Sequence, residues 1–160
     1  VIKERQQTLT SMLPQLNEGE PGHGKRIFFS RKAACSGCHR IENEGGQVGP
    51  DLSQIGRIRS ERDLLEAIVF PSASFARGYE AYTIVTDSGR SYSGVIQSET
   101  ATEITLITTD RRTIRISRSE VELLKQSPVS VMPQGIHKQL SSDELRHLLS
   151  YLRSLQDHQQ

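Results

Sequence analysis

Both cysteines of this 160-residue chain lie in the segment CSGCH, as Cys35 and Cys38, and His39 directly follows the second of them. The order C-x-x-C-H is typical of covalent haem attachment. Each thiol can add to one haem vinyl group, because one helical turn sets the sulfurs apart by the distance between the vinyls, and His39 is delivered to the iron as an axial ligand. A thioredoxin-like cysteine pair would need a βαβ frame, and a zinc site would need further ligands; neither is visible in the sequence. The motif therefore predicts one covalently bound haem.

A second axial ligand is expected, because an electron-transfer haem needs two strong ligands, and the thioether of methionine raises its reduction potential. Met132 lies in the segment 128–135, which contains two prolines and a glycine. Such a backbone is stiff, so little entropy is lost when the sulfur binds iron. We predict that Met132 pairs with His39. The alternatives are that Met132 fills a gap in the core, that Met12 binds instead, or that His137 makes a bis-histidine haem.

Residues around the ligands are also predicted from the sequence. A ligating histidine normally donates its other ring N–H to a carbonyl. The glycine-rich loop after the motif offers the carbonyl of Pro50 for this hydrogen bond. Arg57 and Arg59 follow, and a guanidinium can pair bidentately with a haem propionate. The alternative for both arginines is an ordinary solvated position.

The elements that must position these residues follow from the periodicity of the sequence. Pro21 fits the first turn of a helix that leads into the haem motif. Ser60 with Asp63, and Ser141 with Glu144, predict capped starts of a middle helix ending at residue 70 and of a leucine-rich final helix. Between them the period changes to two, which predicts antiparallel strands at 79–86, 91–96, 102–108, 112–117 and 121–124.

Three segments are expected on this basis. Residues 1–17 form a leading helix or the tail of an upstream region, and 18–78 plus 125–160 form the haem domain. Residues 79–124 form an antiparallel β insertion, so the fold class is mainly α with an inserted sheet, α+β overall. A small sheet must pack its apolar face on something. We therefore expect it to pack on the haem domain beside the haem crevice, to brace the Met132 loop, and to leave an edge strand for a partner domain or a second copy.

Charge and hydropathy limit the functions that remain. The chain has 20 basic and 19 acidic residues, which argues against a nucleic-acid binder that depends on phosphate neutralisation. No apolar run is long enough for a membrane span, and the first residues lack the pattern of a signal peptide. Basic residues near the motif predict either a docking face for an acidic partner or a solvated face; they are Lys25, Arg26, Arg31, Lys32 and Arg40.

The motif, the Gly-Pro-Asp-Leu segment at 49–52 and Met132-Pro133 occur in this order, so the chain resembles a class I cytochrome c over residues 18–75 and 126–156. The β-rich interval before Met132 is longer than in ordinary members. In this respect the chain is similar to the haem-binding domain at the C-terminal end of large secreted planctomycete proteins, where it follows a dehydrogenase-like β-propeller. The resemblance implies a cytochrome c fold for the helical part, with the Pro50 carbonyl bound to the proximal histidine.

The resemblance also implies a function. It implies electron transfer through one covalent haem c, with electrons accepted from a linked dehydrogenase domain or a partner protein, and no enzymatic activity of its own. Covalent haem attachment outside the bacterial cytoplasm implies a periplasmic or otherwise exported protein. A homodimer through the β insertion would be compatible with this function. The alternative is a haem-based sensor or peroxidase-like enzyme, in which the sixth ligand is displaceable.

Overall fold

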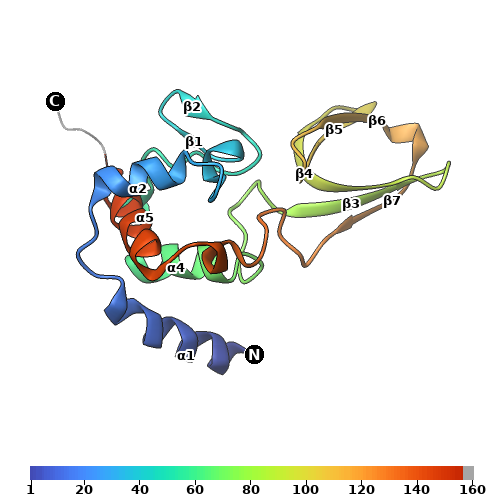
Figure 1. Ribbon diagram of the computed structural model, residues 1–160. Coiled ribbons are helices and arrows are strands. Elements are labelled where there is room, and N and C mark those ends of the chain that lie inside the picture. The colour runs from blue at the N-terminus through green and yellow to red at the C-terminus, as the bar shows by residue number, and fades with distance from the viewer. Residues whose placement is uncertain (157–160) are drawn as a thin grey trace.

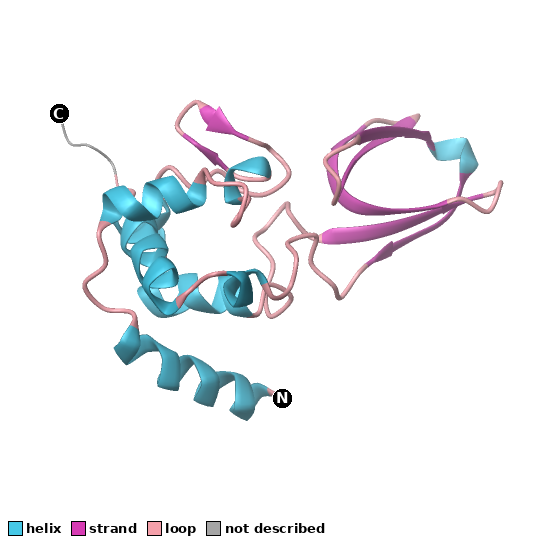
Figure 2. Ribbon diagram, viewed as in Figure 1, coloured by secondary structure: helices cyan, strands magenta, loops and turns pink. Residues whose placement is uncertain are grey.

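Helices occupy both ends of the chain, and a five-stranded sheet lies between them, in the computed structural model, which describes residues 1–156 (Figures 1 and 2). The last four residues of the expected segment 125–160 lie outside the described residues. The helices are α1 (Ile2–Met12), α2 (Pro21–Phe28), α3 (Ile55–Ile58), α4 (Glu61–Val69) and α5 (Ser142–Ser154). Short 3-10 turns are η1 (Leu13–Gln15), η2 (Cys35–Gly37), η3 (Arg118–Glu120) and η4 (Ile136–Gln139).

The strands form two antiparallel sheets. A small hairpin pairs β1 (Arg40–Ile41) with β2 (Glu44–Gly45). The larger sheet has the order β6-β5-β4-β3-β7 and contains β3 (Ala81–Thr86), β4 (Ser91–Glu99), β5 (Glu103–Thr108), β6 (Thr113–Ser117) and β7 (Val121–Gln126). The five strands expected between 79 and 124 are thus present. The periodicity did not predict α3 or the β1–β2 hairpin, because each is too short to repeat a pattern.

The two predicted capping boxes are confirmed. At the start of α4, the Ser60 hydroxyl accepts from the Asp63 peptide N–H, and the Asp63 carboxylate accepts from the Ser60 N–H at 3.1 Å. Ser141 and Glu144 make the same reciprocal bonds at the start of α5. Each box satisfies peptide donors that the first turn leaves without a helical partner.

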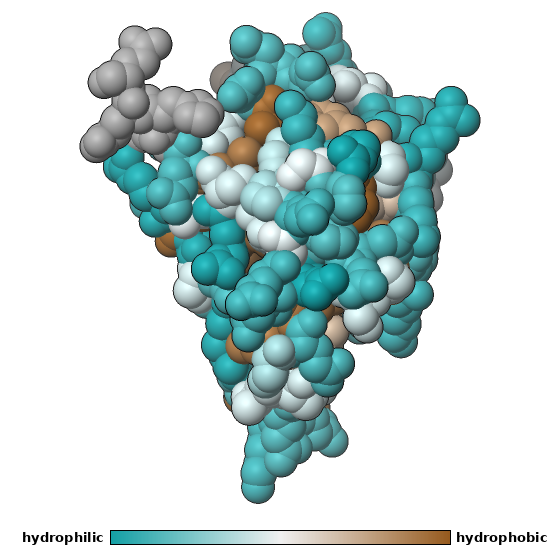
Figure 3. Space-filling model, turned by 60° about the vertical axis from the view of Figure 1, so that its left-hand side comes forward, coloured by the Kyte–Doolittle hydropathy of each residue, from teal (hydrophilic) through white to brown (hydrophobic). Residues whose placement is uncertain are grey.

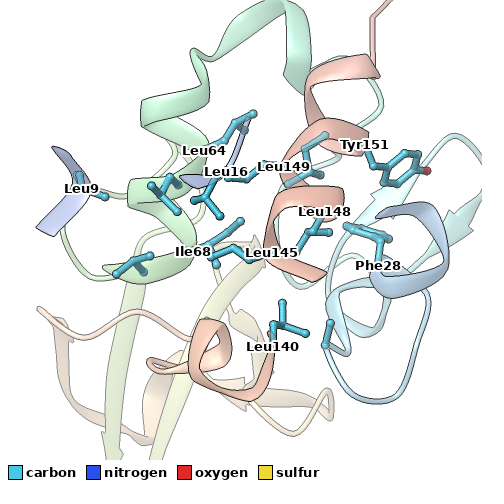
Figure 4. Close-up of a cluster of buried hydrophobic side chains, with 14 of the residues drawn as sticks. Leu9, Leu16, Phe28, Leu64, Ile68, Leu140, Leu145, Leu148, Leu149 and Tyr151 are labelled. Atoms are coloured by element: carbon cyan, nitrogen blue, oxygen red, sulfur yellow. The ribbon is translucent and has the colours of Figure 1, made fainter. Parts of the chain in front are cut away.

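The core of the helical part lies where α5 meets α2 and α4 (Figure 4). Leu145, Leu148 and Leu149 of α5 project into it, which is what a repeat of three and four residues produces. Gly24 of α2 allows a close crossing, because a Cβ there would lie 2.0 Å from the carbonyl oxygen of His147 on α5. Leu9 of α1 is fully buried in the same core, so the leading segment packs on the helical part.

The sheet has a core of its own. Ile84, Ile104, Leu106 and Ile116 are buried together, separate from the helical cluster. The sheet curls in Figure 1, and the four residues of this cluster come from strands β3, β5 and β6 of the curled sheet. The main apolar cluster of the sheet is thus formed by its own strands, whereas Val95 and Ile107 are buried on the side that faces the loop after His39, so the expected packing on the haem domain stays a prediction. Strand twist and curling can enclose a small core without another layer.

The surface of the helical part is mainly hydrophilic in the view of Figure 3, where hydrophobic residues surface only in small spots. Within the described residues, no helix has the length and apolar character that crossing a membrane requires.

Candidate cofactor-binding site

The C-x-x-C-H motif forms one tight turn after α2. Ala34 has a left-handed backbone with φ of 55° and turns the chain into η2. The peptide N–H groups of Cys38 and His39 both donate to the carbonyl of Cys35, at 3.2 and 3.0 Å. The two sulfurs and the imidazole therefore come from one turn of backbone, as attachment to one haem requires.

No disulfide joins Cys35 to Cys38. Burial raises the pKa of Cys35 to about 11. Burial also raises the pKa of Cys38, where the nearby positive charge of Arg111 opposes the shift. The thiol form therefore predominates at neutral pH in both residues.

The imidazole of His39 is held by the loop that follows it. Its Nδ1 lies 2.8 Å from the carbonyl oxygen of Pro50. Because a carbonyl only accepts, Nδ1 carries the proton, and Nε2 is the nitrogen that can bind a metal. Burial lowers the pKa of His39, and the hydrogen bond to Pro50 opposes this. The neutral ring is the form that binds iron.

Glycines allow the loop to approach so closely. A Cβ on Gly49 would lie 2.5 Å from Cε1 of His39, which only glycine avoids. The loop is also tied to the motif by backbone hydrogen bonds, from Gly46 N–H to Ser36 and from Gly49 N–H to Cys38, both 2.8 Å. The glycines and these hydrogen bonds thus hold the loop against the imidazole ring of His39.

The loop that contains Met132 is hydrogen-bonded to the segment that follows α4. The N–H of Ser130 donates to the hydroxyl of Ser72, which follows α4, at 3.0 Å. The N–H of Met132 in turn donates to the Ser130 hydroxyl at 3.1 Å. The side chain of Met132 is half-buried and packs against the helical core. The loop is therefore fixed by the helical part, and sequence reasoning missed Ser72 because its contact is 58 residues away in the chain.

The competing ligands also have defined positions. Met12 of α1 is half-buried against the same core, and α1 packs on α4 through an ion pair of Arg5 with Glu66 at 2.9 Å. In Figure 1, α4 lies between α1 and the η2 turn. His137 lies in η4, and its Nδ1 is buried without a hydrogen-bond partner among the described residues. Burial lowers the pKa of His137.

The basic residues named from the sequence separate into different environments. Arg57 lies in α3 and Arg59 directly after it, and both are exposed. Lys32 is paired with Glu144 at 2.8 Å, so the carboxylate of Glu144 offsets its charge. Arg40 is half-buried, whereas the remaining basic residues of the proposed docking face, Lys25, Arg26 and Arg31, are exposed.

A group of half-buried apolar side chains fits a large apolar cofactor. They pack on the core yet keep part of their surface exposed, and they include Phe29, Cys35, Leu52, Ile55, Phe70 and Met132. Haem would cover apolar surface of this kind, so the residues present fit a haem held by the motif turn. Among residues 1–156, no three His, Cys, Asp or Glu side chains gather into a metal-binding group.

The sheet lies beside the motif, and it brings one residue to the motif that the sequence did not indicate. A cleft of about 340 Å³ lies between the loop after His39 and strands β4 and β5. Arg111, in the β5–β6 turn, crosses to the motif and lies against Gly37. Periodicity gives no signal for this contact, because Arg111 and Gly37 are far apart in the chain.

Comparison with known families gives a match that covers most of the chain. The family described as cytochrome c matches residues 23–156, which include the motif turn, Pro50, Met132 and the whole sheet. No curated protein matches the chain.

Proposed function

The chain belongs to the cytochrome c family, and from this premise we propose that it carries electrons through one haem c, with His39 and Met132 as axial ligands. Proteins of this family bind haem c covalently and are generally electron-transfer modules. A haem held here supplies a reversible one-electron change between Fe(III) and Fe(II). The hydrogen bond from His39 Nδ1 to the Pro50 carbonyl, within a C-x-x-C-H turn, is the observation that supports the proposal most directly.

Each residue has a distinct role in this proposal. Cys35 and Cys38 form the thioether bonds that fix the haem, and His39 presents Nε2 to the iron. Pro50 keeps the imidazole in one tautomer and one orientation. Met132, on a loop fixed through Ser130 and Ser72, completes the coordination so that no substrate binds at the metal.

The proposal extends to the propionates and to partners. Arg57 and Arg59 are proposed to pair with haem propionates. Members of the family work with redox partners and are typically exported or periplasmic, and we propose the same for this chain, with a linked or separate dehydrogenase as the donor. The similarity to the C-terminal domain of planctomycete dehydrogenase-like proteins supports the linked arrangement.

A homodimer through the sheet remains part of the proposal. Strand β7 is an edge strand that pairs only with β3 among the described strands. Its residues Leu123 and Leu124 are 49% and 38% exposed. An exposed edge strand can pair with a second copy.

Extraction with acidified acetone tests the attachment. We expect the haem to stay with the chain, Cys35→Ala or Cys38→Ala to weaken its retention, and His39→Ala to abolish the native spectrum. Release of all haem from the unmodified chain would contradict the proposal. Adding carbon monoxide to the reduced protein separates electron transfer from the sensor or peroxidase alternative, because a retained Met132 blocks the site, whereas a displaceable ligand lets carbon monoxide bind at once.

A further inference from the structure

The β5–β6 turn brings a positive charge to the haem-attachment motif. A Cβ on Gly37, the residue before Cys38, would lie 2.8 Å from Nη1 of Arg111 and 3.5 Å from its Cζ. The guanidinium therefore lies against the backbone between the two cysteines. In Figure 1 the helical part and the sheet lie side by side, and the contact of Arg111 with Gly37 is one place where they meet.

The backbone at Arg111 gives an independent indication that its side chain matters. Arg111 has φ of 64°, in the left-handed region. Its N–H donates to the Thr108 carbonyl at 2.8 Å and closes a short hairpin loop. Glycine or asparagine is the favoured residue at such a position. An arginine there is a strained choice, and strained residues that persist are often functional.

The charge of Arg111 is also not neutralised within the described residues. The carboxylate of the neighbouring Asp110 is bound to Arg112, at 2.6 Å. The guanidinium of Arg111 makes no ion pair in the part of the chain that the structure describes. One whole positive charge therefore remains beside the motif.

We propose that the positive charge of Arg111 raises the reduction potential of the haem held at Cys35 and Cys38. Reduction adds one electron and lowers the charge of the haem by one, so a nearby cation favours the reduced state. Arg111 is exposed, so salt screens its effect. The inference rests on the proposed function, because it requires a haem at this turn.

Midpoint potentials of the holoprotein variants test the inference. Arg111→Gln should lower the potential, and Arg111→Lys should keep it close to that of the unmodified protein. The matched control is Arg90→Gln, since Arg90 lies in the β3–β4 turn, at the far end of the sheet from the helical part (Figure 1). It loses the same charge and should leave the potential unchanged. The difference between Arg111→Gln and Arg90→Gln should shrink as the salt concentration rises.

Arg111→Gly separates the charge from the structure. Glycine relieves the left-handed backbone, so the melting temperature should stay equal or rise while the potential falls as in Arg111→Gln. An unchanged potential in Arg111→Gln, in a protein that retains covalent low-spin haem, would overturn this inference and leave the proposed function intact. An equal fall in Arg111→Lys would also overturn it, because contact and not charge would then be responsible. Loss of haem from the unmodified protein on extraction would instead refute the proposed function.

Discussion

His39 is positioned by residues that are close to it in the chain. Pro50 accepts its Nδ1–H, and Gly49 lets the loop lie against the ring. These contacts were predictable in part, because C-x-x-C-H and a following proline loop act within a few residues of each other. The anchoring of Met132 through Ser130 to Ser72 was not, because nothing local in the sequence joins positions 58 residues apart.

Met132→Ala is expected to remove one axial ligand. The iron should become high-spin or bind a substitute such as His137, and the reduction potential should fall because the thioether favours Fe(II). The visible spectrum and a redox titration measure both effects. Met12→Ala is the control, since Met12 lies on α1 and should leave the sulfur-to-iron band unchanged. If Met12→Ala removes that band and Met132→Ala does not, the ligand assignment is wrong.

At the scale of elements, helices α2, α4 and α5 form the core against which Cys35 and Met132 pack. The leucines of α5 repeat at helical spacing, and both capping boxes were visible in the sequence, so the starts of α4 and α5 were predicted correctly. The close crossing of α2 and α5 was not predictable. Glycine lowers the helix propensity of α2, and the sequence does not show that Gly24 leaves room for the backbone of α5.

Two glycines of α2 provide a matched test of this crossing. Gly24→Ala places a Cβ 2.0 Å from the backbone oxygen of His147 and should destabilise the protein by about 1–3 kcal/mol, the usual cost of overpacking. Gly22→Ala meets nothing within 4 Å and should gain up to about 1 kcal/mol from helix propensity. Chemical unfolding of both variants measures the difference. Equal stability of the two would show that the helices do not cross as described.

The capping box of α4 gives a pH dependence. Hydrogen bonds from Ser60 lower the pKa of the Asp63 carboxyl. A depressed folded-state pKa stabilises the fold above the unfolded value of about 4, and this stability is lost as the pH falls through the folded value. Asp63→Asn should therefore be less stable than the unmodified protein at pH 7, by up to about 1 kcal/mol, and the gap should narrow in acid. Urea unfolding at both pH values measures it, and a gap that widens in acid would contradict the assigned hydrogen bonds.

At the scale of the whole molecule, the sequence predicted an α+β protein with helices at both ends and five strands between, because two different periods mark the segments. It did not predict that the sheet would enclose an apolar cluster of its own. Side-chain alternation shows that one face is apolar, but not whether that face closes on itself, and Ile84, Ile104, Leu106 and Ile116 do close on one another. The contact of Arg111 with Gly37 was not predicted either, because the two residues are far apart in the chain.

Replacing residues 79–124 with a short Gly-Ser linker tests the independence of the sheet. The ends of the insertion are close, since Ser127 N–H donates to the Ala81 carbonyl at 2.8 Å, so a short linker spans them. The helical part should keep its covalent haem and Met132 ligation, because Ser72 and Ser130 lie outside the deletion. Its potential should fall as in Arg111→Gln. Loss of the sulfur-to-iron band would show that the sheet braces the Met132 loop after all.

A redox titration of the purified holoprotein, followed by its visible spectrum, tests the central claim most directly. We predict one reversible one-electron transition, low-spin spectra in both oxidation states, and a far-red sulfur-to-iron band in the oxidised protein, since His39 and Met132 both stay on the iron. A high-spin spectrum in either state, or an oxidised spectrum without the far-red band, would contradict an electron-transfer site with these two ligands.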